Sequence, residues 1–202
     1  MDFTFSEDAE LIRQTVHEFV RRDLLPQEPK FLNAKTSSER QEIARNATEK
    51  IREMGLYSAG VPEEFGGGGL GPIETCLIAE ELSYTIIPVE WGDFTPILYE
   101  CSETQKKDYL LPVVSGEKNY ALAFRELEPF SAPEQMKTTA QPEGENYRLN
   151  GIKELSRDEF DFCLVFARTP EGVTCFLLNP NTPGCEIQTE FEPARLILTD
   201  CL

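Results

Sequence analysis

Five glycines stand among the last six residues of the stretch VPEEFGGGGLG, residues 61–71. Successive glycine N–H groups can hold a phosphate, which is the chemistry of nucleotide-binding loops. Such a loop follows a strand and opens a helix, and its P-loop form places a lysine after the glycines. Here a helical pattern comes first, Glu63 and Glu64 would repel an anion, and the run leads into Pro72 with no lysine. We therefore expect a turn between two helices.

Few other residues are candidates for catalysis or metal binding. His17 is the only histidine, which excludes a multi-histidine metal site and disfavours a Ser/His/Asp arrangement. It lies within a helical pattern, so a structural role is favoured for it. The cysteines are widely spaced and contain no CxxC pair, and most lie in apolar surroundings, where buried, reduced thiols are expected. They are residues 76, 101, 163, 175, 185 and 201. No metal site and no catalytic residue is predicted.

The pattern of the first half of the chain predicts helices, two of which would flank the glycine run. Ser6 and Thr36 are suited to cap two of them, and Glu39 completes a capping-box pattern with Thr36. Ser102 and Gln105 repeat this pattern further on. Apolar residues recur at helical spacing and predict buried stripes. The stripes comprise Ile12, Val16, Phe19 and Val20, then Ile43, Ala47, Ile51 and Met54, then Ile73, Cys76, Leu77 and Leu82.

From Tyr120 onward the pattern changes to short apolar and β-branched runs, separated by turn sequences such as PEGEN and NPNTPG. Strands with frequent turns indicate an antiparallel sheet or small barrel. The predicted fold class is therefore α+β, with a helical domain at 1–117 and a β-domain at 118–202. The chain ends while still reading as a strand, so we expect the β-domain to be incomplete.

Composition excludes several classes of protein. The formal net charge of −17 and the absence of a basic patch argue against nucleic-acid binding. No apolar run is long enough for a membrane span, and no secretory signal precedes the first helix. We therefore expect a cytoplasmic protein. The acidic surface is either simply solvated or an interface for a basic partner subunit.

The glycine stretch resembles a segment of the acyl-CoA dehydrogenases, in the form GLYSAGVPEEFGGGGLG. Further segments resemble this family in the same order along the chain. They are MDFTFSEDAELIRQTVHEFV, IAEELS, ETQKKDYLLPVVSGEKNYALA, YRLNGIK and DFCLVFART. The resemblance implies a helical domain, a β-domain and then a C-terminal four-helix domain, the last of which is absent here. It implies an oxidoreductase of fatty acid metabolism in which a carboxylate removes an α-proton while FAD accepts the β-hydride.

The family's catalytic glutamate lies in the missing domain, so no residue here inherits that role. The resemblance places the flavin-binding positions at Leu122, Ala123, Ser131 and Leu155. Ala123 stands where the family has a threonine and Leu155 where it has a tryptophan that packs on the flavin. Ser131 is the nearest match to the serine of the flavin loop. These departures predict weak FAD binding by this chain alone.

Two interpretations follow from the resemblance. The chain is part of a flavoenzyme that acts on an acyl thioester, carried by coenzyme A or a carrier protein. Alternatively, it is a non-catalytic structural or regulatory subunit with a degenerate flavin site. Either form would work as a homo-oligomer or with a homologous subunit, and activity of this chain alone is not expected. The segment Tyr84–Phe94 is a candidate acyl pocket, although ordinary core packing explains it better.

Overall fold

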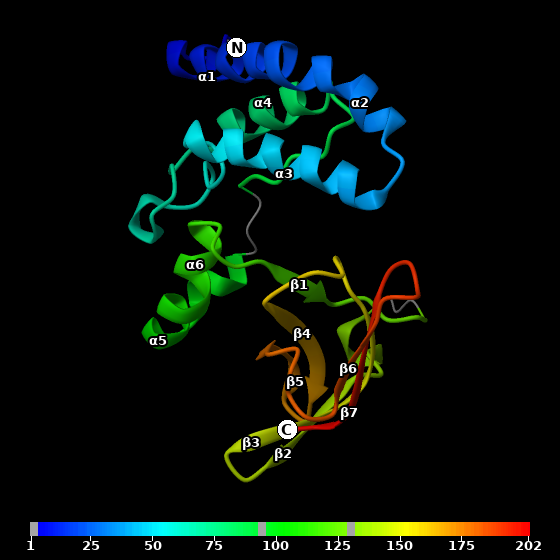
Figure 1. Ribbon diagram of the computed structural model, residues 1–202. Helices are drawn as coiled ribbons and strands as arrows, with labels where there is room; N and C mark the ends of the chain where they lie inside the picture. The colour runs from blue at the N-terminus through cyan, green and yellow to red at the C-terminus, as the bar shows by residue number, and fades with distance from the viewer. Residues whose placement is uncertain (1–3, 93–95, 129–131) are drawn as a thin grey trace. The chain divides into compact units, whose positions relative to one another are not determined.

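The computed structural model describes residues 4–92, 96–128 and 132–202 (Figure 1). The chain forms two compact units, Met1–Glu117 and Lys118–Leu202. The first consists of helices and the second of strands. This α+β order agrees with the fold class predicted from the sequence. None of the described helices is long and apolar enough to cross a membrane.

The helical unit begins each of its long helices at the predicted cap. The Ser6 and Thr36 hydroxyls accept the N–H groups of Ala9 and Glu39. The Glu39 carboxylate accepts the N–H of Lys35 and not that of Thr36, so only half of the predicted capping box forms. The helices are α1 (Glu7–Phe19), α2 (Glu28–Asn33), α3 (Ser37–Glu53), α4 (Pro72–Leu82), α5 (Glu103–Gln105) and α6 (Leu111–Val114). A π-helical turn, η1 (Val20–Leu24), continues α1.

The core of the helical unit lies between α1, α3 and α4. Val16 of α1, Ile51 of α3 and Ile78 of α4 are fully buried in it. The predicted inward face of α4 is partly wrong, because Ile73 and Cys76 are exposed. The buried face of α4 instead comprises Leu77, Ile78, Glu81 and Leu82.

The glycine run forms the predicted turn. Five successive N–H groups, from Gly66 to Leu70, donate to backbone carbonyl oxygens of residues 58–63. Gly67 lies so close to the Val61 backbone that a side chain there would overlap its carbonyl group. The N–H groups that a phosphate would need are therefore already used, and close backbone packing explains the glycine.

The β unit is one curled seven-stranded sheet (Figure 1). Its strands are β1 (Tyr120–Ala123), β2 (Thr139–Glu143), β3 (Asn146–Glu154), β4 (Phe162–Thr169), β5 (Gly172–Leu178), β6 (Cys185–Gln188) and β7 (Arg195–Cys201). The order is β1-β4-β2-β3-β7-β6, with β5 also paired to β4. The sheet is mixed and not purely antiparallel as predicted, because β4 pairs in parallel with β1 and, at Thr139 and Arg168, with β2.

Side chains of β1, β2, β3, β4, β5 and β7 contribute to the core of the β unit. Along β3 and the residue after it, Leu149, Lys153 and Leu155 are all buried. Together with Gly151 they occupy every second position, as expected for one face of a strand. A lysine, Lys153, therefore lies on the inward face of the strand between two leucines. Its charge needs partners inside the β unit, which are described below.

Candidate functional site

The four predicted flavin positions have different environments. Ala123 is completely buried and Leu155 is 3% exposed, and both belong to the core of the β unit. Leu122 is half-buried. Ser131 lies outside the described residues. The structure therefore brings Leu122, Ala123 and Leu155 into one region, although two of these side chains face the protein interior.

Leu122 and Ser156 are joined by two hydrogen bonds. The Leu122 N–H donates to the Ser156 hydroxyl over 2.8 Å, and the Ser156 N–H donates to the Leu122 carbonyl over 3.1 Å. The Glu154 N–H donates to the Arg125 carbonyl over 2.9 Å. Residues 154–156 therefore run along the edge of β1 that faces away from β4.

A buried ion pair lies next to this edge. Lys153 Nζ is 3.0 Å from Glu126 Oε1 and also donates to the Phe124 carbonyl over 3.1 Å. The Glu126 carboxylate accepts the N–H groups of Lys137 and Thr138, each over 2.8 Å. The Lys153 and Glu126 side chains are 0% and 4% exposed. The pair thus connects the segment after β1 to β3 and to the two residues just before β2.

Burial and hydrogen bonding act in opposite directions on the pKa of Glu126. Burial raises it, but the Thr138 hydroxyl, two main-chain N–H groups and Lys153 lower it to about 2. Among the described residues, no hydrogen bond of good geometry reaches the Thr138 oxygen, so the main-chain donors and Lys153 are the better-defined cause. Burial lowers the pKa of Lys153, and Glu126 opposes that shift. The carboxylate is held ionised, which suits an anchor and not a general base near neutral pH.

Sequence reasoning missed Glu126, Lys153 and Ser156. One signal for Lys153 was available, because it follows Leu149 and Gly151 at alternate positions and must face the same side of its strand. A buried lysine requires a partner carboxylate or several acceptors. Nothing in the local pattern identified Glu126, since its donors come from residues 137, 138 and 153.

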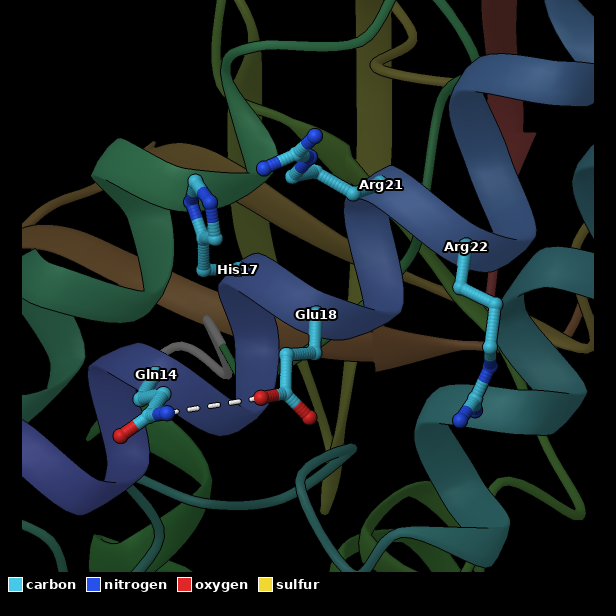
Figure 2. Close-up of a pocket in the computed structure, with 5 residues that line it drawn as sticks. All are labelled: Gln14, His17, Glu18, Arg21 and Arg22. Carbon is cyan, nitrogen blue, oxygen red and sulfur yellow. Dashed lines mark hydrogen bonds between the residues drawn. The ribbon is translucent and has the colours of Figure 1, made fainter.

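A separate hollow of about 540 Å³ lies along α1 and η1, lined by Gln14, His17, Glu18, Arg21 and Arg22 (Figure 2). His17 Nδ1 lies 2.9 Å from the largely buried carboxylate of Glu81. Gln14 donates to Glu18 over 3.4 Å. The contact with α4 gives His17 the structural role expected from the sequence.

The remaining candidates do not form a common site. In the segment proposed as an acyl pocket, Tyr84 and Ile86 are exposed, whereas Ile87 is buried in the helical core. Asp93 and Phe94 lie outside the described residues. No group of three or more metal-ligating side chains occurs among the residues described. Burial raises the pKa of Cys163 to about 12, so its thiol is protonated at neutral pH.

The chain is a two-unit α+β protein, in which a helical unit is followed by a curled mixed sheet. Those flavin positions predicted from the sequence that the structure describes lie at the end of β1 and just after β3. The model of the acyl-CoA dehydrogenase N-terminal domain matches residues 6–117. The chain belongs to the acyl-CoA dehydrogenase family, as its resemblance indicated.

Three comparisons show the extent of the likeness. The chain is 28% identical over 220 residues to the mitochondrial isovaleryl-CoA dehydrogenase of Pongo abelii, covering 97% of this chain and 51% of that protein. The FAD-complexed acyl-CoA dehydrogenase of Bacillus anthracis is 26% identical, with a TM-score of 0.71 over 98% of this chain and 36% of that one. The ChsE4–ChsE5 complex of Mycobacterium tuberculosis shares the fold at 23% identity, with a TM-score of 0.77 over all of this chain and 56% of that one. The chain thus spans about half the length of these relatives, or less.

Proposed function

We propose that the chain is part of an acyl-CoA dehydrogenase-type oxidoreductase that oxidises an acyl thioester between its α and β carbons. One observation carries this proposal: both units match, in order, an acyl-CoA dehydrogenase that was solved with FAD. The thioester would be attached to coenzyme A or to a carrier protein. The base that removes the α-proton would come from a domain or subunit beyond the described residues.

FAD is the cofactor that the proposed reaction requires, since it accepts the hydride when bound. The described positions in this chain do not fit the flavin contacts that the resemblance assigns to them. Ala123 has no hydroxyl, and both it and Leu155 face the core of the β unit. The Leu122 N–H is already bonded to Ser156. We therefore derive no step of the reaction from these residues.

A second candidate is a structural subunit whose homologous partner holds the flavin. The burial of Ala123 and Leu155 favours it, because these side chains complete a hydrophobic core without a cofactor. In this arrangement the helical and β units would support an active partner. Homo-oligomers and hetero-oligomers of family members remain the two proposed assemblies.

Binding of the thioester can be measured without flavin. We expect calorimetric titration of the purified chain to show tighter binding of an acyl-CoA than of free coenzyme A, because the acyl chain adds apolar contact area. Equal affinities for acyl-CoA and free coenzyme A would show that this chain does not recognise the acyl group. Dehydrogenase turnover should then be assayed with FAD and an artificial electron acceptor, with the chain alone and with the full reading frame. Turnover by the chain alone would contradict the assignment of the base to another domain or subunit.

A further inference from the structure

The open edge of β1 is occupied by the chain itself. β1 has one strand partner, β4, on one side. On the other side, both main-chain groups of Leu122 bond to Ser156, and the Arg125 carbonyl accepts the Glu154 N–H. A ligand that reads an exposed strand edge needs such donors and acceptors free. Here it would have to displace an internal hydrogen bond.

The same is true of the segment that follows β1. The Phe124 carbonyl and the Glu126 carboxylate both accept Lys153 Nζ. Glu126 is further held by the Lys137 and Thr138 N–H groups. Polar groups at four positions between 122 and 126 therefore have internal partners. Moving the segment to admit a ligand would leave the Lys153 ammonium, which is 0% exposed, without its counterion.

We propose that Ser156 closes the β1 edge, and that this chain does not bind FAD through residues 122–126 and 155–156. The inference rests on the proposed function only for the identity of the cofactor. Ser156 is an exposed residue, and its hydroxyl accepts the main-chain N–H of Leu122, so this N–H is not available to a ligand. The flavin of the proposed reaction would then depend on contacts from outside these residues, such as those of another domain or a partner subunit.

Amide hydrogen exchange on the full chain tests whether Ser156 closes the β1 edge. Amide hydrogen exchange should find the Leu122 N–H protected, and Ser156→Ala should speed its exchange about tenfold, the value of one hydrogen bond. Ser156→Thr retains the hydroxyl and is the matched control, with exchange close to that of wild type. An unprotected Leu122 amide in the wild type would overturn the closure.

Titration with FAD, followed by visible circular dichroism of the flavin, tests the consequence. We expect no saturable signal up to about 100 μM FAD, which corresponds to a binding free energy weaker than about 5.5 kcal/mol. Stoichiometric FAD in the wild-type chain would overturn the proposal. If a saturable signal appears only in Ser156→Ala, the closure by Ser156 is supported. Acyl-CoA titration needs no flavin, so loss of thioester binding would refute the proposed function and leave the closure intact.

Discussion

Replacing Glu126 by glutamine should destabilise the β unit strongly. Glutamine keeps the shape of the side chain and one acceptor oxygen, but it removes the charge opposite Lys153. The Lys153 side chain is 0% exposed and would keep neutral acceptors, the Phe124 carbonyl 3.1 Å away and the remaining amide oxygen, but no counterion. The new amide NH₂ would also face one of the main-chain donors that the carboxylate now accepts. Removing one partner of a buried pair costs about 3–5 kcal/mol. Because burial also disfavours the Lys153 charge, we expect the lower end, about 3 kcal/mol.

Urea unfolding followed by far-ultraviolet circular dichroism measures this loss as a lower transition midpoint. Glu128→Gln is the matched control, since that side chain is 74% exposed and pairs with the exposed Lys137. It should change stability by less than about 0.5 kcal/mol. The double variant Glu126→Gln, Lys153→Met should recover at least half of the loss, because it removes the uncompensated charge. A Glu126→Gln variant within about 1 kcal/mol of wild type would refute the assignment of a stabilising buried anchor.

Three more predictions follow from the described contacts. Because the pKa of Glu126 is lowered from 4.5 to about 2, its contribution is complete above pH 4.5 and is lost as the pH falls towards 2. Melting temperatures across this range should show a fall that is smaller in Glu126→Gln. Gly67→Ala should lower the melting temperature more than Gly144→Ala, because a side chain at Gly67 overlaps backbone, whereas Gly144 has open space and its alanine would carry only the strain of a positive φ. A thiol-reactive reagent near neutral pH should label the exposed Cys76 before the buried Cys163, and Cys76→Ser should abolish the fast phase. Fast labelling that persists in Cys76→Ser would show that another thiol is accessible.

Elements defined by local chemistry could be predicted from the sequence. The Ser6 cap and the buried positions of α3 depend on residues within a few places of each other, so their spacing is sufficient. The glycine run was also predictable as a turn, because it lacks the lysine and the preceding strand of a phosphate loop. The reason for the turn was not predictable, since Gly67 packs against a carbonyl six residues earlier.

Contacts between distant segments could not be predicted in this way. Glu81 of α4 is buried, and His17, on a different helix, lies 2.9 Å from its carboxylate. The parallel pairing of β1 with β4 joins Tyr120 to Phe162 across the whole β2–β3 hairpin. Composition and periodicity contain no information about either partner. The sequence therefore did not predict the parallel pairs of the sheet, and it missed β2, whose last residues, Pro142 and Glu143, belong to the predicted turn sequence PEGEN.

The burial of Ala123 and Leu155 gives a physical reason for our proposal that this chain does not hold FAD at these positions. Ala123 and Leu155 are part of the core, where an apolar side chain of fitting size is stabilising. A threonine at the fully buried Ala123 would bring a hydroxyl that needs a partner, at a cost of about 1–3 kcal/mol if none is found. With a bound flavin, such a hydroxyl would have an acceptor and the cost would be offset. Without one, alanine is the more stable choice. The residues at these two positions are therefore those that favour a β unit folded independently of a cofactor, and the polar network of Glu126 and Lys153 holds the same segment in place by internal contacts alone.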